Sequence, residues 1–350
     1  MNAKKAVWIF LAYAIISQQS LAGTISTVAV IDANGGVTLD SAGDIYAADY
    51  GVATATSGSR FVWKLSPSGA FDPIIFVSDI NIASGNDFDS QDNLFQSNFG
   101  GASISKIDPS GVVTVFSTAV NGPVGIAIDD SDNLFVNNCH DNSISRITAA
   151  GIASTFVASA DFNCPNGITR GANGDFYVIN FHDGRIFHIT AAGTMTDFAA
   201  VTAPGGHVAI VGDRLYATSF GGHRIYGFDL SGANAGNVVV TIGSGVAGSA
   251  GGSYAVASFD KPNGITTDAT GAVLYVTDNT GVRKIELEDE VAPPPPPPPP
   301  PPAGSGGGGG GSLSWVFILA GMLLARLKNR VTRYFRRGNV VLKSMIATQG

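Results

Sequence analysis

A hexapeptide that recurs six times along the chain constrains the fold more than any other feature of the sequence. The copies read IYAADY from Ile45, LFQSNF from Leu94, LFVNNC from Leu134, FYVINF from Phe176, LYATSF from Leu215 and LYVTDN from Leu274. Successive copies are 49, 40, 42, 39 and 59 residues apart. A period of about 40 residues indicates that one supersecondary unit is stacked against copies of itself.

Each repeat is predicted to contain four short strands, as the third copy illustrates. A strand at GIAID from Gly125 is followed by the turn DDSDN, the hexapeptide, SISRI from Ser143 and IASTFV from Ile152. Short strands separated by Gly, Asn and Asp are typical of antiparallel meanders. Runs with a helical period are absent between residues 23 and 290. Six such units predict an all-β fold, a six-bladed β-propeller over residues 23–290.

The sixth repeat has only three of its four strands, GITTD, LYVTD and VRKIEL. A segment that resembles the missing fourth strand, TISTVAVI, lies near the other end of the chain, at Thr24 to Ile31. Pairing these two parts of the chain would complete the last blade and remove the open edge of the ring. We therefore expect the propeller to be closed by its N-terminal strand.

Residues 1–22 have the features of a secretory signal peptide. Lys4 and Lys5 precede an apolar run over residues 6–16, and Ser20-Leu21-Ala22 provides a cleavage site. We expect the protein to be exported across the inner membrane, to the periplasm or the cell surface, and to begin at Gly23 once processed.

The C-terminal part of the chain is expected to hold a stalk and a membrane segment. Residues 291–312 form a linker with ten consecutive prolines, which adopt polyproline II, followed by glycines. Residues 313–330 are predicted to form a short hydrophobic helix, and residues 331–350 a basic tail. Because the basic residues follow the apolar ones, this tail is expected in the cytoplasm and the propeller outside.

The charge of the chain excludes one class of partner. Between the signal peptide and Pro302 there are 11 basic and 27 acidic residues, a net charge of about −16. A surface this acidic repels phosphate backbones, so nucleic acid is not expected as a partner.

The run from Gly243 to Leu287 resembles an NHL repeat in its Gly/Ser lead, Pro-x-Gly-Ile strand and Tyr-Val-x-Asp segment. The other five units are similar to the wider six-bladed group that includes SMP-30/gluconolactonase and the virginiamycin B lyases. The C-terminal order of glycines, a short apolar stretch and a basic cluster resembles GlyGly-CTERM sorting signals. That resemblance implies a sorting protease that removes the tail, whereas a lasting membrane anchor is the alternative.

The only two cysteines, Cys139 and Cys164, are expected on one face of the ring in adjacent blades. Cys139 follows a second strand, and Cys164 precedes the first strand of the next blade. Because an exported protein folds under oxidising conditions, we predict a disulfide between them.

Three histidines, His140, His182 and His207, are candidates for a general base or a zinc site on the same face. The alternative is that they are ordinary polar loop residues. The resemblance to gluconolactonases implies a Ca²⁺ site at the channel mouth with ligands among Asn86, Asp87, Asn166 and Asn263. Those enzymes also supply a glutamate from an early blade, which this chain lacks, and a Pro-Asn-Gly triplet also suits a tight turn.

No sequence motif for nucleophilic, metal-dependent or phosphate chemistry is present in the repeats. We therefore interpret the protein as a binding module that takes a small molecule, a glycan or a protein at its channel mouth. The alternative is a Ca²⁺-dependent hydrolase or lyase of the gluconolactonase-like or virginiamycin B lyase-like type.

Overall fold

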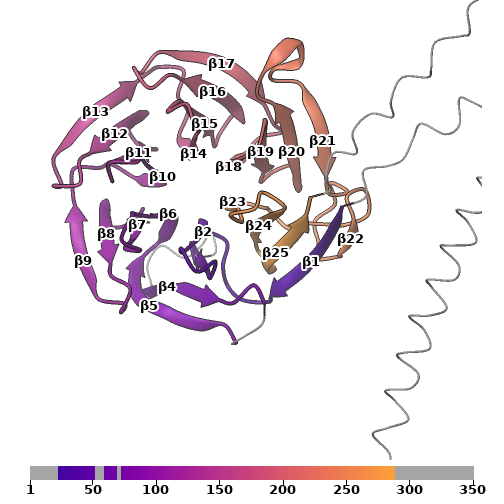
Figure 1. Cartoon of the computed structure of the whole chain (residues 1–350), viewed down its shortest axis with the longest axis horizontal. Helices are drawn as coiled ribbons and strands as arrows, with labels where there is room; N and C mark the ends of the chain where they lie inside the picture. Colours follow the sequence, from indigo (N-terminus) through magenta and orange to yellow (C-terminus); the bar gives the residue numbers. More distant parts are fainter. Residues whose placement is uncertain (1–22, 52–58, 69–71, 288–350) are drawn as a thin grey trace, which may run out of the picture. The chain divides into compact units, whose positions relative to one another are not determined.

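The computed structural model describes residues 23–51, 59–68 and 72–287. In this part of the chain, six antiparallel sheets are arranged around a common axis as the blades of a propeller (Figure 1). The predicted fold class, an all-β six-bladed propeller, is confirmed. The signal peptide, the linker, the hydrophobic helix and the basic tail expected from the sequence lie outside the described residues. Within those residues, no helix has the length and apolar character needed to cross a bilayer.

Blades one to five each contain four consecutive strands that pair in chain order. In blade one they are β2 (Val37–Leu39), β3 (Ile45–Ala48), β4 (Ser59–Leu65) and β5 (Ile74–Asn81). In blade two they are β6 (Ala83–Phe88), β7 (Leu94–Asn98), β8 (Ser103–Ile107) and β9 (Val113–Ser117). In blade three they are β10 (Pro123–Ile128), β11 (Leu134–Asn138), β12 (Ser143–Ile147) and β13 (Ala153–Ala158).

Blades four and five follow the same order. Blade four contains β14 (Pro165–Arg170), β15 (Phe176–Asn180), β16 (Arg185–Ile189) and β17 (Met195–Ala200). Blade five contains β18 (Gly205–Val211), β19 (Arg214–Ser219), β20 (Arg224–Asp229) and β21 (Val238–Ile242), with the 3-10 helix η1 (Gly232–Asn234) before β21. The hexapeptide found in the sequence thus lies on the second strand of each blade.

Blade six joins the two ends of the propeller. Its inner strands are β23 (Ile265–Thr267), β24 (Val273–Asp278) and β25 (Gly281–Glu286). The N-terminal strand β1 (Thr24–Ala29) pairs with β25, with Ile25 opposite Ile285, which confirms the expected closure. A fifth strand, β22 (Gly252–Ser253), pairs with the outer side of β1 and was not expected from the sequence.

The core lies between adjacent blades, where apolar residues of the middle strands pack face to face. Between blades three and four, for example, the rings of Phe135 and Phe176 have centroids 4.4 Å apart. Acidic turns connect the first and second strands: Asp129 Oδ1 accepts hydrogen bonds from the backbone N–H groups of Ser131 and Asn133, each at 2.9 Å. These turns are therefore hairpin structure.

Candidate functional site

The first strands of the blades approach one another closely around the axis, and glycine makes this approach possible. A Cβ atom on Gly85 would lie 2.4 Å from the carbonyl oxygen of Val124 in the next blade, and one on Gly125 would lie 2.3 Å from that of Asn166. Any larger side chain would have to displace backbone at these positions. The glycine of the Pro165-Asn166-Gly167 triplet lies inside strand β14, so the triplet serves this close packing rather than a tight turn.

Polar side chains also join neighbouring blades near this contact. Asn137 Nδ2 donates to the carbonyl oxygen of Asn166 at 2.9 Å, and Asn166 Nδ2 donates to that of Gly206 at 3.0 Å. Further along the ring, Thr218 Oγ1 donates to the carbonyl of Asn263 at 2.6 Å, and Asn263 Nδ2 donates to that of Asn34 at 2.7 Å. Two of the residues predicted to bind Ca²⁺, Asn166 and Asn263, thus hold blades together through their amide nitrogens.

A cavity of about 330 Å³ occupies the axis of the propeller. Most of its lining comes from apolar residues and threonines on the first strands of all six blades. Its other polar side chains come from Asn86, Asp87, Arg170 and His207. Arg170 is paired with Asp130 on the surface at 3.0 Å, so the polar groups that remain for a ligand are the threonine hydroxyls and the side chains of Asn86, Asp87 and His207.

Asn86 is unusual among the residues at its level in the cavity. Its equivalents on the other first strands include Ile126, Ile168 and Val208, whereas its own side chain is an amide. Asn86 is only 7% exposed, and neither Oδ1 nor Nδ2 has a hydrogen-bond partner among the described residues. Since a buried amide without partners is costly, this side chain is suited to water or to a small polar molecule.

Asp87 lies next to Asn86 and carries the one carboxyl group that lines the cavity in the described structure. Burial raises the pKa of Asp87 to about 6, although hydrogen bonds from the backbone N–H groups of Phe88 and Ile128 stabilise its charged form. This carboxyl therefore changes charge within the physiological range.

His207 faces the cavity from blade five. It is 8% exposed, and its Nε2 has no hydrogen-bond partner among the described residues. Burial lowers the pKa of His207 to about 4, so the imidazole is neutral near pH 7. When the blades are aligned by strand pairing, His207 occupies the position that is glycine, Gly85 or Gly125, in blades two and three. Blade five therefore has a side chain at a position where those blades have only a hydrogen atom.

The four predicted Ca²⁺ ligands differ in their contacts. Asn86 and Asp87 line the cavity, whereas Asn166 and Asn263 do not belong to its lining and donate to neighbouring blades. Within the described residues, no group of three or more His, Cys, Asp or Glu side chains is arranged to hold a metal ion. Asparagine oxygens are not among these groups, and Asn86 Oδ1 and Asn263 Oδ1 are buried without a hydrogen-bond partner among the described residues, so a Ca²⁺ site with these oxygen ligands stays a prediction.

The three predicted histidines also differ in their surroundings. His207 lines the cavity, while His140 and His182 are exposed on loops and are absent from its lining. His140 lies edge-on to Phe99 with ring centroids 5.0 Å apart, and His182 lies edge-on to Phe181 at 5.4 Å. These two histidines therefore lie against aromatic rings in the mouth loops, whereas His207 lies on a first strand.

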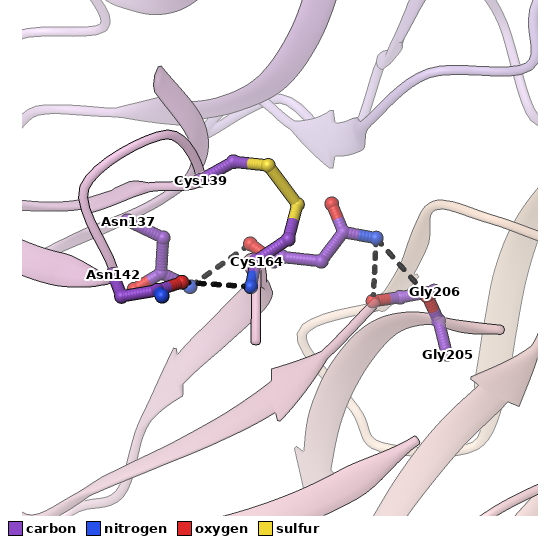
Figure 2. The surroundings of a disulfide bond; sticks show 7 residues. Asn137, Cys139, Asn142, Cys164, Gly205 and Gly206 are labelled. Carbon is purple, nitrogen blue, oxygen red and sulfur yellow. Dashed lines mark hydrogen bonds between the residues drawn. A yellow bond between two sulfur atoms is a disulfide. The ribbon is translucent and has the colours of Figure 1, made fainter. Parts of the chain in front are cut away.

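The disulfide predicted between Cys139 and Cys164 is present and joins blades three and four on the mouth face (Figure 2). Beside it, Asn142 Oδ1 accepts a hydrogen bond from the backbone N–H of Cys164 at 3.0 Å. Covalent and hydrogen-bonded links therefore fix the same two loops.

The residue that ends each hexapeptide forms a second feature of the mouth face, which the sequence reasoning did not use. It is Tyr50, Phe99, Phe181 and Phe220 in blades one, two, four and five, and we call these four side chains the aromatic collar. All four are half-buried. The rings of Tyr50 and Phe99 have centroids 5.9 Å apart, and those of Phe181 and Phe220 are 5.7 Å apart. The signal was visible in the sequence as an aromatic at one position of four repeats.

Two of the four collar residues are held by the same backbone contact. The N–H of Phe99 donates to the carbonyl of Ile82 at 3.0 Å, and that of Phe181 donates to the carbonyl of Cys164 at 2.8 Å. In both blades the partner immediately precedes the first strand. Phe99 and Phe181 are therefore held in the same way, whereas the N–H of Tyr50 donates to Asn34 Oδ1 at 3.1 Å.

These features define the chain as a six-bladed propeller with an axial cavity that holds a few polar side chains and with four aromatic rings at its mouth. No protein-family model matches the sequence, and neither does any curated protein. The chain is similar in structure to an auxiliary nutrient binding protein from Bacteroides ovatus, with a TM-score of 0.61 and 14% identity over 76% of this chain and 77% of that chain.

Two further solved structures represent the groups that the sequence resembles. A gluconolactonase from Xanthomonas campestris matches with a TM-score of 0.59 and 15% identity, over 76% of this chain and 90% of that chain. Virginiamycin B lyase from Staphylococcus aureus matches with a TM-score of 0.53 and 17% identity, over 75% of this chain and 98% of that chain. The resemblance in fold is thus confirmed, while at these identities function does not follow from it.

Proposed function

We propose that this protein is a binding module that takes its ligand on the channel-mouth face. The aromatic collar is the observation that supports the proposal most. The blade fold does not require an aromatic side chain at this position, because Cys139 and Asn279 occupy it in blades three and six. Four half-buried rings that the fold does not need, gathered on one face, are typical of a recognition surface.

The setting of this surface is also part of the proposal. An N-terminal signal and the apolar segment at residues 313–330 are consistent with a propeller displayed outside the inner membrane. The polyproline linker would hold the propeller away from the bilayer. In the alternative in which the tail is processed, a sorting protease would release the propeller. The mouth face would then be presented to ligands in the periplasm or at the cell surface.

The proposal is tested by screening the full-length protein against a glycan array, a displayed peptide library and a small-metabolite library. We expect one class to bind, and the double variant Phe181→Ala/Phe220→Ala to weaken that binding by tenfold or more, since each ring contributes about 1 kcal/mol. Phe116→Ala is the matched control, because Phe116 is also half-buried but lies on the outer strand β9. A ligand that binds the collar variant and the control equally well would contradict the proposal.

A second candidate function, a hydrolase or lyase, is favoured by the axial cavity. Asp87 and the neutral His207 both line it, and a carboxyl with a pKa of about 6 is suited to general-base catalysis. In the Ca²⁺-dependent version of this alternative, the ligand oxygens would come from Asn86, Asp87, Asn166 and Asn263, of which Asn86 and Asp87 line the cavity.

The second candidate is tested by lactone hydrolysis assays with and without added Ca²⁺. If Asp87 is the base, the rate should rise with pH through about 6, and Asp87→Asn should abolish that rise. Asp92→Asn, on an exposed turn of the same blade, should leave the profile unchanged. Stoichiometric Ca²⁺ binding that Asn166→Ala removes would instead support the metal-dependent alternative.

A further inference from the structure

We infer that the ligand of the mouth face is a neutral saccharide that stacks on the aromatic collar. This inference rests on the proposed function and names its ligand class. It comes from the arrangement of aromatic rings, exposed amides and charges around the mouth.

The collar consists of two platforms on opposite sides of the axis. Tyr50 and Phe99 form one on blades one and two, and Phe181 and Phe220 form the other on blades four and five. Blades one and four, and blades two and five, are each three steps apart in a ring of six, so the two pairs are related by about half a turn (Figure 1). The rings within each pair are tilted, by 50° and 60°, and both are half-buried. Each pair therefore offers a fixed apolar surface with little freedom to collapse.

Exposed amides adjoin the collar position in three consecutive blades, two of which carry a platform ring. The carbonyl oxygens of Asn81, Asn121 and Asn163 accept hydrogen bonds from the residue that follows the collar position in blades two, three and four, at 3.2, 3.4 and 3.3 Å. Their backbones are thereby fixed, while all three side chains are exposed. The mouth thus repeats a unit in which an exposed amide adjoins the collar position.

This combination matches the chemistry of a pyranose. A pyranose ring has faces made of C–H groups, which pack on the negative face of an aromatic ring, and a rim of hydroxyls that both donate and accept. An asparagine amide supplies two donors and one acceptor oxygen at a single position. An apolar peptide would instead favour a continuous apolar surface, whereas here Cys139 and the exposed Asn279 interrupt the ring of aromatics.

The charge of the mouth points to a neutral sugar. None of the six collar-level residues and none of the three amide residues is charged, while the loops that carry them also hold the acidic residues Asp141, Asp161 and Asp183, which repel an anionic sugar. The chain between the signal peptide and Pro302 carries a net charge of about −16, which disfavours binding of uronic acid polymers and sulfated glycans. One cation approaches a platform, with Lys261 Nζ 5.7 Å from the centre of the Phe220 ring.

The test uses the full-length protein and a panel of neutral cello-, malto-, xylo-, manno- and chito-oligosaccharides, with alginate as the anionic probe. Saturation-transfer NMR should show transfer mainly to ring C–H protons of one neutral family, and calorimetry gives the affinity. Removing one platform, by Tyr50→Ala/Phe99→Ala or by Phe181→Ala/Phe220→Ala, should weaken binding about tenfold, and removing both should abolish it. Asn163→Ala should weaken binding by a smaller factor, whereas Phe116→Ala should not change it.

The outcomes separate this inference from the proposed function. No binding by the neutral panel, or tighter binding of alginate, overturns the saccharide assignment. If collar variants lose a peptide or metabolite ligand found in the broader screen, the mouth face remains the binding surface and only the saccharide assignment falls. If a saccharide binds but all collar variants bind it as the parent does, both fall. Retained circular dichroism spectra in the variants exclude misfolding as the cause of lost binding.

Discussion

Blade three and blade six lie on opposite sides of the ring and are held in it by different means (Figure 1). Blade three is one continuous stretch of chain, and its link to blade four on the mouth face includes the Cys139–Cys164 disulfide. Blade six combines the N-terminal strand β1 with three strands from the end of the propeller. A blade made from distant segments cannot form until most of the ring exists, so it needs contacts that a local blade does not.

In blade six, additional contacts are made by a buried ion pair between Arg283 and Asp278. The side chains of Arg283 and Asp278 are 0% exposed, with Nη1 and Oδ2 3.4 Å apart. Arg283 also donates to the carbonyls of Ser258 at 2.9 Å and Ala250 at 3.1 Å, both in the long connection between β21 and β23, and its guanidinium lies over Phe259. One cation therefore connects the second and third strands of the blade to the β21–β23 connection, whose strand β22 pairs with β1. A buried pair of this kind fixes one arrangement of these segments, even where it adds little net stability.

The largest effect that tests this comparison is expected from Arg283→Met. The substitution leaves the Asp278 carboxylate buried without its cation and removes the donors to two carbonyls, so the free energy of unfolding should fall by about 4 kcal/mol at pH 7. Burial already raises the pKa of Asp278, and loss of the guanidinium, which lowers it, should raise it further. A carboxyl whose folded pKa exceeds its unfolded value destabilises the fold when charged, so the penalty should shrink as the pH falls below that pKa. Urea unfolding at pH 7 and pH 4 measures both effects.

Arg185→Met is the matched control for this experiment. Arg185 also lies over a phenylalanine and pairs with carboxylates, Asp161 and Asp197, but its side chain is 36% exposed. Because exposed ion pairs contribute little, the control should lose less than about 1 kcal/mol and show no comparable change with pH. Equal losses in the two variants would show that burial is not what distinguishes blade six.

Much of the architecture was predictable because local and global signals agree. The hexapeptides fixed six second strands, and the four strands that surround Leu134 and Ser143 were predicted to within about two residues. Closure by the strand at Thr24 was predictable because only one segment resembled the missing strand. The short strand β22 was not, since its Gly252–Ser253 pair has no strand propensity and is placed by the docked β21–β23 connection.

The candidate site was predictable only in part. The sequence located Cys139, Cys164 and the cavity residues Asn86, Asp87 and His207, because the repeat register assigns each of them to the end of the first strand or the mouth loops. It did not show that the amide of Asn166 would donate hydrogen bonds to the carbonyl oxygens of Gly205 and Gly206, because that contact depends on how closely adjacent blades approach each other. The distance between neighbouring blades is set by glycines such as Gly167. In the sequence alone, this glycine is indistinguishable from one that forms a tight turn.

A smaller effect is expected on the opposite side of the ring, from Cys139→Ala/Cys164→Ala. The disulfide closes a loop of 25 residues, so its removal should lower the free energy of unfolding by about 3 kcal/mol through the greater entropy of the unfolded chain. Blade three keeps its four contiguous strands and the hydrogen bond from Cys164 N–H to Asn142, so urea unfolding should remain one cooperative transition. Hydrogen exchange should accelerate only in the two mouth loops, and this change should not depend on pH as that of Arg283→Met does. If the double variant instead unfolds in two steps, with blade six intact in the first, the disulfide is holding the ring together and the contrast between a local and a composite blade fails.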